Sequence, residues 1–346
     1  MCQLAAYVGD RPLAKTLLDS LRAQEGYLGG HTAGIAALNS GGIDLVKGCG
    51  PVDEVIKKTG IDRLTGTAGI AHSRYNVWAS KSPKYNTPGA SHPWIDDTGK
   101  IALMHNGEIK NCWEHFERLR SDHVFQSYIE EYNYITDSEV AVHLLGDEIS
   151  KGTSVKEALR RVTPKLTGRF LLGVVHAEHP ETVWIANWFQ PCYVAVGESE
   201  AMFSSAKIGL KHVINEMTSI FQPPKNSIIE LSRGRVEITV MDPGRRVVDL
   251  TLDANEMGRQ IMRILGEKGE LDPVSLYFAL VEDGFNEALH VSPERWSNIR
   301  DAGFGEANHI LETIYMLEAE GMLNIRVDVR GEWGLENVPR LMFSLT

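Results

Sequence analysis

A cysteine directly behind Met1 is the residue of this chain whose type and position most clearly suggest chemistry. Methionine aminopeptidases remove Met1 when the next residue is small, and removal would leave Cys2 with a free α-amine beside its own thiol. An α-amine has a pKa of about 7.7–8.0 and a thiol of about 8.5, so the amine can take the thiol proton and make Cys2 both nucleophile and base. Taken alone, such a cysteine is more often a small buried hydrophobic residue of the first strand.

The dipeptide Asn106–Gly107 could supply an oxyanion hole, which an acyl-transfer site needs. It lies in KIALMHNGEIKN, residues 100–111, where an apolar strand is expected to turn into a helix. The Asn106 amide and the Gly107 N–H would both point at a developing negative charge there. An ordinary turn is the other interpretation, because Asn-Gly is a common turn dipeptide.

Arg74 and Asp137 could hold the two charges of a free amino acid. Arg74 follows the apolar run 66–72 and offers the two-pronged cation that a carboxylate fits. Asp137 offers a carboxylate for an ammonium group, and Thr136 with Glu139 forms a capping-box pattern that would place Asp137 at the first helical position. Each residue alone has a simpler explanation, namely a solvated surface arginine and an acidic first turn that complements the helix dipole.

The elements that must position these side chains follow from the apolar spacing. We expect helices at 11–24, 107–119, 137–150 and 154–164, and strands at 33–38, 42–47, 66–72 and 100–105. A strand-rich stretch follows from 169 and ends with a strand at 247–252. Strands before and after paired helices predict an α+β protein with two packed sheets and helical layers outside.

Near residue 253 the strand-rich pattern gives way to helical segments, so we expect one domain over 2–250 and a second over 251–346. The second part predicts helices at 253–269, 272–284 and 306–322, then strands at 324–334 and 340–346. Helices followed by a two-stranded ribbon is the order of a winged-helix module, although many small α+β domains share it. This part contributes -9 of the formal net charge of -11, which disfavours nucleic-acid binding.

Composition narrows the class of protein further. Hydrophobic residues make up 43% of the chain and charged residues 23%, as in ordinary globular proteins. The four cysteines form no CxxC pair, so neither a zinc site nor a disulfide framework is indicated. We find neither an apolar run long enough for a membrane span nor a basic leader, so we expect a cytoplasmic protein without membrane contact.

Five segments in order give a resemblance to a known family. They are Met-Cys at the start, then AHSRY, SHP, HNGEIKN and TDSE. Together they resemble the class II glutamine amidotransferases. The motif pattern is most similar to that of the glutaminase domains of glucosamine-6-phosphate synthase and glutamine phosphoribosylpyrophosphate amidotransferase. The resemblance covers roughly residues 2–250 and implies the four-layer αββα sandwich of N-terminal-nucleophile (Ntn) hydrolases.

The resemblance also implies a role for each motif residue. Cys2 would attack the glutamine side-chain amide and form a thioester, with its α-amine as base and then as acid. Asn106 and Gly107 would form the oxyanion hole. Arg74 would bind the glutamine α-carboxylate, and Asp137 its α-ammonium group.

Further positions follow from the same resemblance. Gly29 would lie close to the nucleophile and the substrate, and residues 75–81 would form a loop that closes over glutamine. His72 and His92 would shape the site without being catalytic. The chain departs from the family where many members read Arg-Gly-x-Asp, because residues 28–31 read Leu-Gly-Gly-His and the arginine is missing.

A second departure is at 187–192, where Asn-Trp-Phe-Gln-Pro-Cys replaces the family's Arg-x-Pro-Leu. Both departures concern how the site is activated and which partner it serves, and they leave the nucleophile and the glutamine-binding residues intact.

Glutamine is thus the expected substrate, and the chemistry requires no metal or organic cofactor. No sugar-isomerase pair, phosphoribosyltransferase signature or complete pyrophosphatase loop is found, so we expect a separate ammonia-accepting synthase subunit. Residues 251–346 would serve docking, regulation or assembly of a homo-oligomer. Two alternatives stay open: an Ntn hydrolase of another amide, and a non-catalytic glutamine-sensing or scaffold protein. The pair Arg74 and Asp137 favours a free amino acid as ligand.

Overall fold

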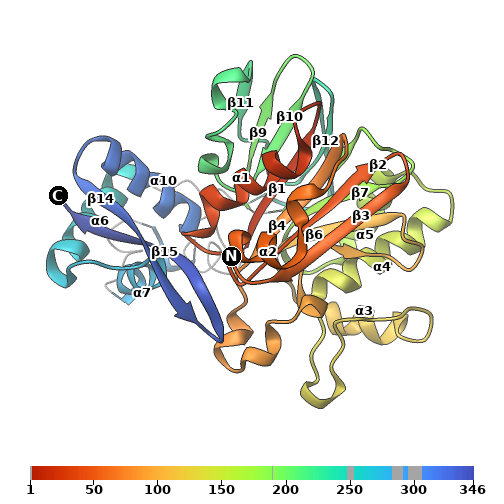
Figure 1. Ribbon diagram of the computed structural model, residues 1–346, viewed down its shortest axis with the longest axis horizontal. Coiled ribbons are helices and arrows are strands. Elements are labelled where there is room, and N and C mark those ends of the chain that lie inside the picture. Colours follow the sequence, from red (N-terminus) through yellow and green to blue (C-terminus); the bar gives the residue numbers. More distant parts are fainter. Residues whose placement is uncertain (1, 189, 248–252, 283–290, 295–305) are drawn as a thin grey trace.

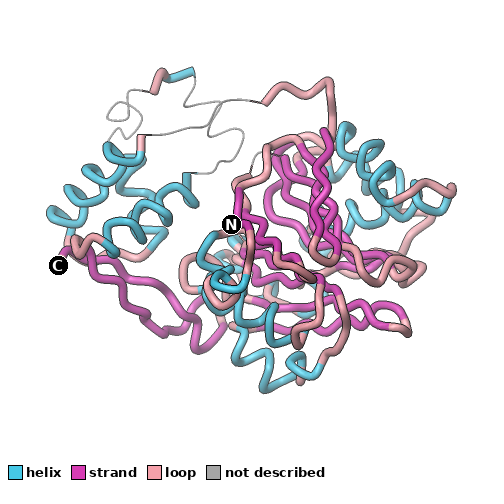
Figure 2. Tube along the Cα trace, turned by 90° about the horizontal axis from the view of Figure 1, so that it is seen from above, coloured by secondary structure: helices cyan, strands magenta, loops and turns pink. Residues whose placement is uncertain are grey.

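Two antiparallel sheets lie face to face in the N-terminal part of the computed structural model (Figures 1 and 2). The structure describes residues 2–188, 190–247, 253–282, 291–294 and 306–346. The first sheet has the order β11 (Ser219–Phe221), β9 (Tyr193–Val196), β10 (Ala201–Ser204), β1 (Gln3–Val8), β4 (Ala68–Arg74), β2 (Thr32–Asn39), β3 (Gly42–Cys49). The second has the order β13 (Arg235–Val240), β12 (Ser227–Ser232), β8 (Val183–Trp188), β7 (Gly168–His176), β6 (Ile101–Ile109), β5 (Trp94–Ile95).

The alternation of side chains along β1 shows why two sheets must stack. Leu4, Ala6 and Val8 point into the layer between the sheets, where they pack with residues of β7 and β8 such as Leu171 and Ile185. The intervening residues of β1 are also buried, on the opposite face against a helix. Because both faces of this strand are apolar, each sheet needs a helical cover as well as a partner sheet.

The helices provide that cover. On the first sheet lie α1 (Leu13–Glu25) and α2 (Val52–Thr59). On the second lie α4 (Asp137–Ser150) and α5 (Val155–Val162), with α3 (Cys112–Leu119) beside α4. The predicted αββα sandwich is therefore confirmed.

Two local predictions are wrong. The strand expected to end at 105 continues as β6 to Ile109, and the helix expected from 107 begins only at Cys112. Gly107 lies opposite Phe170 of β7 with a φ of 134°, and a Cβ at this glycine would lie 2.2 Å from a backbone oxygen. Long-range strand pairing therefore overrides the local turn signal of Asn-Gly.

The predicted capping box is also absent. Asp137 is the first residue of α4 as expected, but the Thr136 side chain makes no capping hydrogen bond. Glu139 instead accepts hydrogen bonds from the backbone of Gln126 and from Ser127, at 2.7 and 2.8 Å. The acidic side chain thus stabilises the preceding loop rather than its own helix end.

The C-terminal part follows the predicted order of helices and a strand pair. It contains α6 (Ala254–Lys268), α7 (Pro273–Glu282), α10 (Glu306–Ala319), β14 (Leu323–Glu332) and β15 (Leu335–Leu345). The hairpin of β14 and β15 extends from these helices to the N-terminal part (Figure 1), where the Leu341 N–H donates at 2.7 Å to the carbonyl of Gly26, the residue after α1. The second strand begins at Leu335, earlier than the predicted 340. Residues 248–252 of the strand expected at 247–252, the boundary at 250 and the end of the helix expected at 272–284 lie outside the described residues.

Candidate active site

A cavity of about 800 Å³ lies where β1 begins, β4 and β6 end and α4 starts. Its wall includes Cys2, Arg74, Gly107 and Asp137, four of the six residues singled out from the sequence. Small-molecule sites usually have volumes of roughly 300–1,000 Å³. The sheets therefore bring residues far apart in the sequence to one cavity of suitable size.

Cys2 stands at the start of β1, the strand between β4 and β10. Its backbone nitrogen donates a 3.0 Å hydrogen bond to Oδ1 of Asn106. Its Sγ lies 4.0 Å from the carbonyl oxygen of Tyr75, to which the thiol can donate. Removal of Met1 would turn the nitrogen into an α-amine next to the thiol, already oriented by Asn106.

Asn106 and Gly107 approach Cys2 from the neighbouring sheet. Because the Cys2 nitrogen can only donate through its N–H, Asn106 must present its oxygen there, and Nδ2 is left as a donor. Among the described residues, Nδ2 of Asn106 has no hydrogen-bond partner. Asn106 itself is 5% exposed and is not among the residues that line the cavity, whereas its neighbour Gly107 is.

Arg74 ends β4 and is 93% buried, with 7% of its surface exposed at the cavity. One terminal nitrogen donates to the carbonyl of Ala90, and the other donates to the hydroxyl of Tyr134 at 2.9 Å. These contacts use two of the five N–H donors of a guanidinium. A fixed cation in the wall of a cavity suits a carboxylate ligand, and the solvated-surface interpretation of Arg74 is wrong.

Asp137 places a carboxylate in the same cavity wall. Its Oδ2 accepts a hydrogen bond from the Ile109 N–H at 2.9 Å, and its Oδ1 accepts one from Ser138 Oγ at 3.1 Å. Burial alone would raise the pKa of Asp137, but His105, 3.4 Å away, and these hydrogen bonds hold the pKa below its ordinary value. The carboxylate is therefore ionised and positioned at neutral pH.

Ser138, which the sequence did not single out, connects Asp137 to two histidines in the cavity wall. Its Oγ donates to Asp137, so it must accept from His92 at 2.6 Å and from His105 at 2.9 Å. His72 stacks on His92 with ring centroids 4.1 Å apart, and burial lowers the pKa of His72 to about 3. The expectation that His72 and His92 shape the site fits this neutral, buried cluster. The TDSE motif contained the one available signal for Ser138, since it directly follows Asp137.

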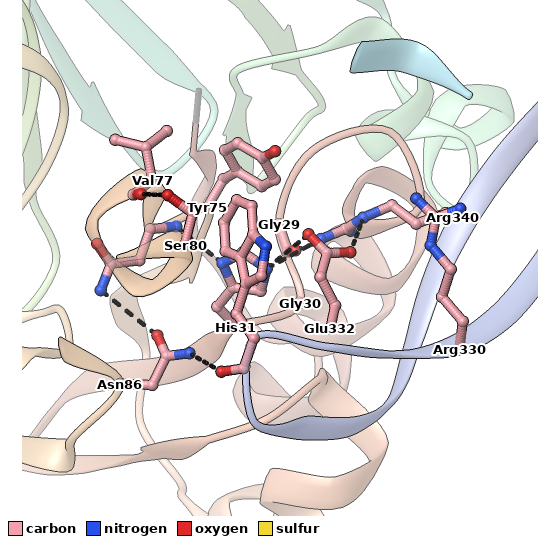
Figure 3. A network of polar contacts seen from close by, with 12 residues as sticks. Gly29, Gly30, His31, Tyr75, Val77, Ser80, Asn86, Arg330, Glu332 and Arg340 are labelled. Carbon is pink, nitrogen blue, oxygen red and sulfur yellow. Dashed lines mark hydrogen bonds and ion pairs between the residues drawn. The ribbon is translucent and has the colours of Figure 1, made fainter. Parts of the chain in front are cut away.

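Gly29, which we expected close to the nucleophile and the substrate, is not among the residues that line the cavity. It packs against Ser73 and Glu25, where a Cβ would lie 2.9 Å from the serine hydroxyl oxygen. Its carbonyl oxygen accepts a hydrogen bond from Arg340 of β15 at 3.0 Å (Figure 3). The segment that lacks the family's arginine thus contacts an arginine from the C-terminal hairpin.

One cluster on the outer side of the second sheet has the composition of a metal site. The ligand atoms of Asp97, His123 and His143 lie within 4.8 Å of one another. His123, however, already contacts Asp97 at 2.7 Å and Asp147 at 3.1 Å through its two ring nitrogens. These pairs account for His123 as part of an ion-pair network, apart from the cavity of Cys2.

No helix among the described residues is long and apolar enough to cross a membrane.

A family model described as a glutamine amidotransferase domain matches residues 81–211.

Curated relatives share the N-terminal part of the chain. The glutamine–fructose-6-phosphate aminotransferase of Thermococcus kodakarensis is 34% identical over 209 residues, which are 60% of this chain and 32% of that protein. The enzyme of the same name from Thermus thermophilus is 34% identical over 265 residues, 75% of this chain and 41% of the relative. The chain therefore spans about a third to two fifths of these relatives.

A solved structure shares the fold. Glutamine phosphoribosylpyrophosphate amidotransferase from B. subtilis superposes with a TM-score of 0.60 at 16% identity, covering 84% of this chain and 64% of that one. At that identity the likeness concerns the fold. Taken with the family match and the sequence relatives, it shows that the chain contains a class II glutamine amidotransferase domain with the Ntn-hydrolase fold.

Proposed function

We propose that Cys2, once Met1 is removed, hydrolyses the side-chain amide of glutamine to glutamate and ammonia. The observation that carries this proposal is the placement of Cys2, Arg74, Gly107 and Asp137 in the wall of one cavity. A nucleophile, a backbone donor, a buried cation and an ionised carboxylate are the groups that hydrolysis of a free amino acid's amide needs.

The reaction can be written with these groups. The α-amine of Cys2 takes the thiol proton, and the thiolate attacks the amide carbon. The Gly107 N–H and the Nδ2 of Asn106 stabilise the negative charge on the carbonyl oxygen. When the carbon–nitrogen bond breaks, the α-ammonium group returns its proton to the leaving nitrogen, which gives ammonia and a thioester. Water then attacks the thioester carbon, one water proton passes by way of the amine to the sulfur, and glutamate leaves.

Arg74 and Asp137 favour glutamine over other amides. The guanidinium of Arg74 would bind the α-carboxylate, and the carboxylate of Asp137 would bind the α-ammonium group. An amide substrate that lacks either charge would leave the buried Arg74 or the half-buried Asp137 without its counterpart, which is costly.

We further propose that the ammonia serves a synthase on a separate subunit. The named relatives are aminotransferases of which this chain matches 32 to 41%. Ammonia formed in a cavity of an amidotransferase domain needs an acceptor site, and the small C-terminal part of helices and one hairpin offers a docking element for the protein that holds it. Glutamine-dependent product formation by a purified complex of this chain with a co-isolated synthase would test the proposal.

The test of the proposed activity is glutamate release from glutamine, after mass spectrometry has verified the loss of Met1. The Cys2→Ala variant should lose the activity. Cys112→Ala is a matched control, because Cys112 lines the same cavity but burial raises the pKa of its thiol to about 12. Equal activity of wild type and Cys2→Ala would contradict the proposal, and so would failure of Cys2→Ala to bind glutamine.

A further inference from the structure

The β14–β15 hairpin meets the chain at the residue that follows Arg74 (Figure 3). The ring of Tyr75 stacks on His31 with centroids 5.0 Å apart, and Trp333 at the hairpin tip lies 5.5 Å from the Tyr75 ring. The guanidinium carbon of Arg340 lies 5.4 Å from the centre of the same ring. Two side chains of the hairpin therefore fix the ring of Tyr75.

Tyr75 also touches the candidate nucleophile. Its carbonyl oxygen lies 4.0 Å from Sγ of Cys2, and Tyr75 forms part of the cavity wall. A single residue thus contacts the hairpin through its ring and Cys2 through its backbone. Tyr75 is also the first residue of the segment 75–81, so these contacts join the hairpin to the start of that segment.

A buried ion pair joins the two strands of the hairpin, and both of its members contact the N-terminal part, Arg340 at Gly29 and Glu332 at His31. Arg340 is 1% exposed and donates to Glu332 at 2.7 Å and to the Gly29 carbonyl at 3.0 Å. Burial alone would raise the pKa of Glu332, but His31 and Arg340 lower it to about 2. The carboxylate is therefore ionised over the whole physiological range.

His31 carries this connection to the backbone of the loop. The Asn76 N–H donates to Nδ1 of His31 at 2.9 Å, so Nδ1 must carry a lone pair. Burial lowers the pKa of His31, and the proton of the neutral ring is then on Nε2, which donates to Glu332 at 3.1 Å. Nη2 of Arg340 also lies 3.1 Å from Nε2, but a protonated Nε2 cannot accept, so Arg340 is a close neighbour of this ring and not a donor to it. Glu332 is thus linked through one imidazole to the second residue after Arg74.

The tip of the hairpin carries an unusual residue for its conformation. Trp333 and Gly334 form the two-residue connection, with φ values of 48° and 81°. Such left-handed positions favour glycine, asparagine and aspartate over bulky side chains. The tryptophan is therefore poorly suited to the turn, and its contacts with His31 and Tyr75 are what it contributes.

We propose that the β14–β15 hairpin is a positioning element of the glutamine site, which holds Tyr75 and Asn76 where Arg74 and Cys2 can meet the substrate. Trp333, Glu332 and Arg340 are its positioning residues. Docking of the C-terminal part then sets the affinity for glutamine, and a partner that moves the hairpin would regulate the site. This inference rests on the proposed glutaminase function.

The decisive variant is Trp333→Asn, because asparagine suits the turn and removes only the ring. We expect the KM for glutamine to rise about tenfold, the equivalent of about 1.4 kcal/mol, while kcat changes less than about twofold. Trp333→Phe should recover most of the wild-type KM. Val327→Asn is the control, since Val327 lies on the same hairpin and is 58% exposed.

Hydrogen exchange provides a measurement that needs no substrate. In Trp333→Asn, the amide of Asn76 should exchange at least about tenfold faster than in the wild type, because its acceptor His31 is no longer held in place. Unchanged exchange at Asn76 together with an unchanged KM would overturn the inference. If the wild-type protein neither binds nor hydrolyses glutamine, the proposed function fails, whereas the exchange result still decides whether the hairpin positions the loop.

Discussion

The nitrogen of Cys2 donates a 3.0 Å hydrogen bond to the side-chain oxygen of Asn106. The same amide group must therefore offer its Nδ2 on the other side, so one side chain serves both the candidate base and the candidate oxyanion hole. The two functions of Asn106 can be separated by substitution, because they use different atoms of the amide.

Asn106→Asp keeps an oxygen for the Cys2 amine but removes the Nδ2 donor and adds a negative charge. We expect kcat to fall by about 10²–10³, the usual loss for one oxyanion-hole donor, and to fall at least as far as in Asn106→Ala. KM for glutamine should change little. A kcat for Asn106→Asp close to that of the wild type would show that only the contact with the amine matters.

Arg74→Ala should lower kcat/KM only for substrates that carry an α-carboxylate. We expect kcat/KM for glutamine to fall about 10–100-fold, as for the loss of a charge-assisted hydrogen bond of roughly 1.5–3 kcal/mol. The slow hydrolysis of 4-aminobutanamide, which lacks the α-carboxylate, should be the same in variant and wild type. Equal losses on both substrates would mean that Arg74 is structural, acting through Ala90 and Tyr134.

Ser138→Ala should destabilise the protein by about 1–3 kcal/mol, because two buried histidines lose their acceptor. Ser150→Ala is a matched control on the same helix, where the serine is exposed and bonds only to a backbone oxygen. Urea unfolding of both variants checks this. A loss in Ser138→Ala no larger than in the control would contradict the assigned network.

Stability should decrease as the pH falls below about 6.5. Burial lowers the pKa of His72 to about 3 and that of His92 well below its ordinary value, so the unfolded chain binds protons there that the folded chain does not. Between the pKa of a histidine in the unfolded chain, about 6.5, and its lower pKa in the folded protein, each such histidine reduces the free energy of unfolding by about 1.4 kcal/mol for each pH unit of acidification. His72→Gln can still donate to the His105 carbonyl, and it should make the slope shallower. An unchanged slope in denaturation curves measured at pH 4.5–7 would refute the prediction.

Much of the site was predictable because its residues lie in short motifs. Cys2, Arg74 and Asp137 each follow or precede an element whose apolar pattern is local, and the structure places all three in one cavity. The strand through Asn106 and Gly107 was not predictable in the same way. Its course depends on pairing with Leu171 and Phe170, far along the chain, against a dipeptide that locally favours a turn.

The contacts of the C-terminal part could not be predicted at all. Arg340 reaches His31 and Gly29 across about 310 residues, and no spacing or composition connects them. The sequence does not show that an arginine is buried or which residues it contacts, because these depend on the folded structure. The missing arginine at residues 28–31 indicated that this segment differs, but it did not indicate that Arg340 contacts it.

The position of Cys2 at the start of the central strand β1 restricts how this protein can be extended, by evolution or at the bench. The proposed chemistry requires a free α-amine on Cys2, so anything attached ahead of Cys2 must be cleaved off before that amine can act as base. New domains, affinity tags and fluorescent fusions therefore belong behind Thr346. Gene fusions that join this domain to an ammonia-using enzyme should place it first.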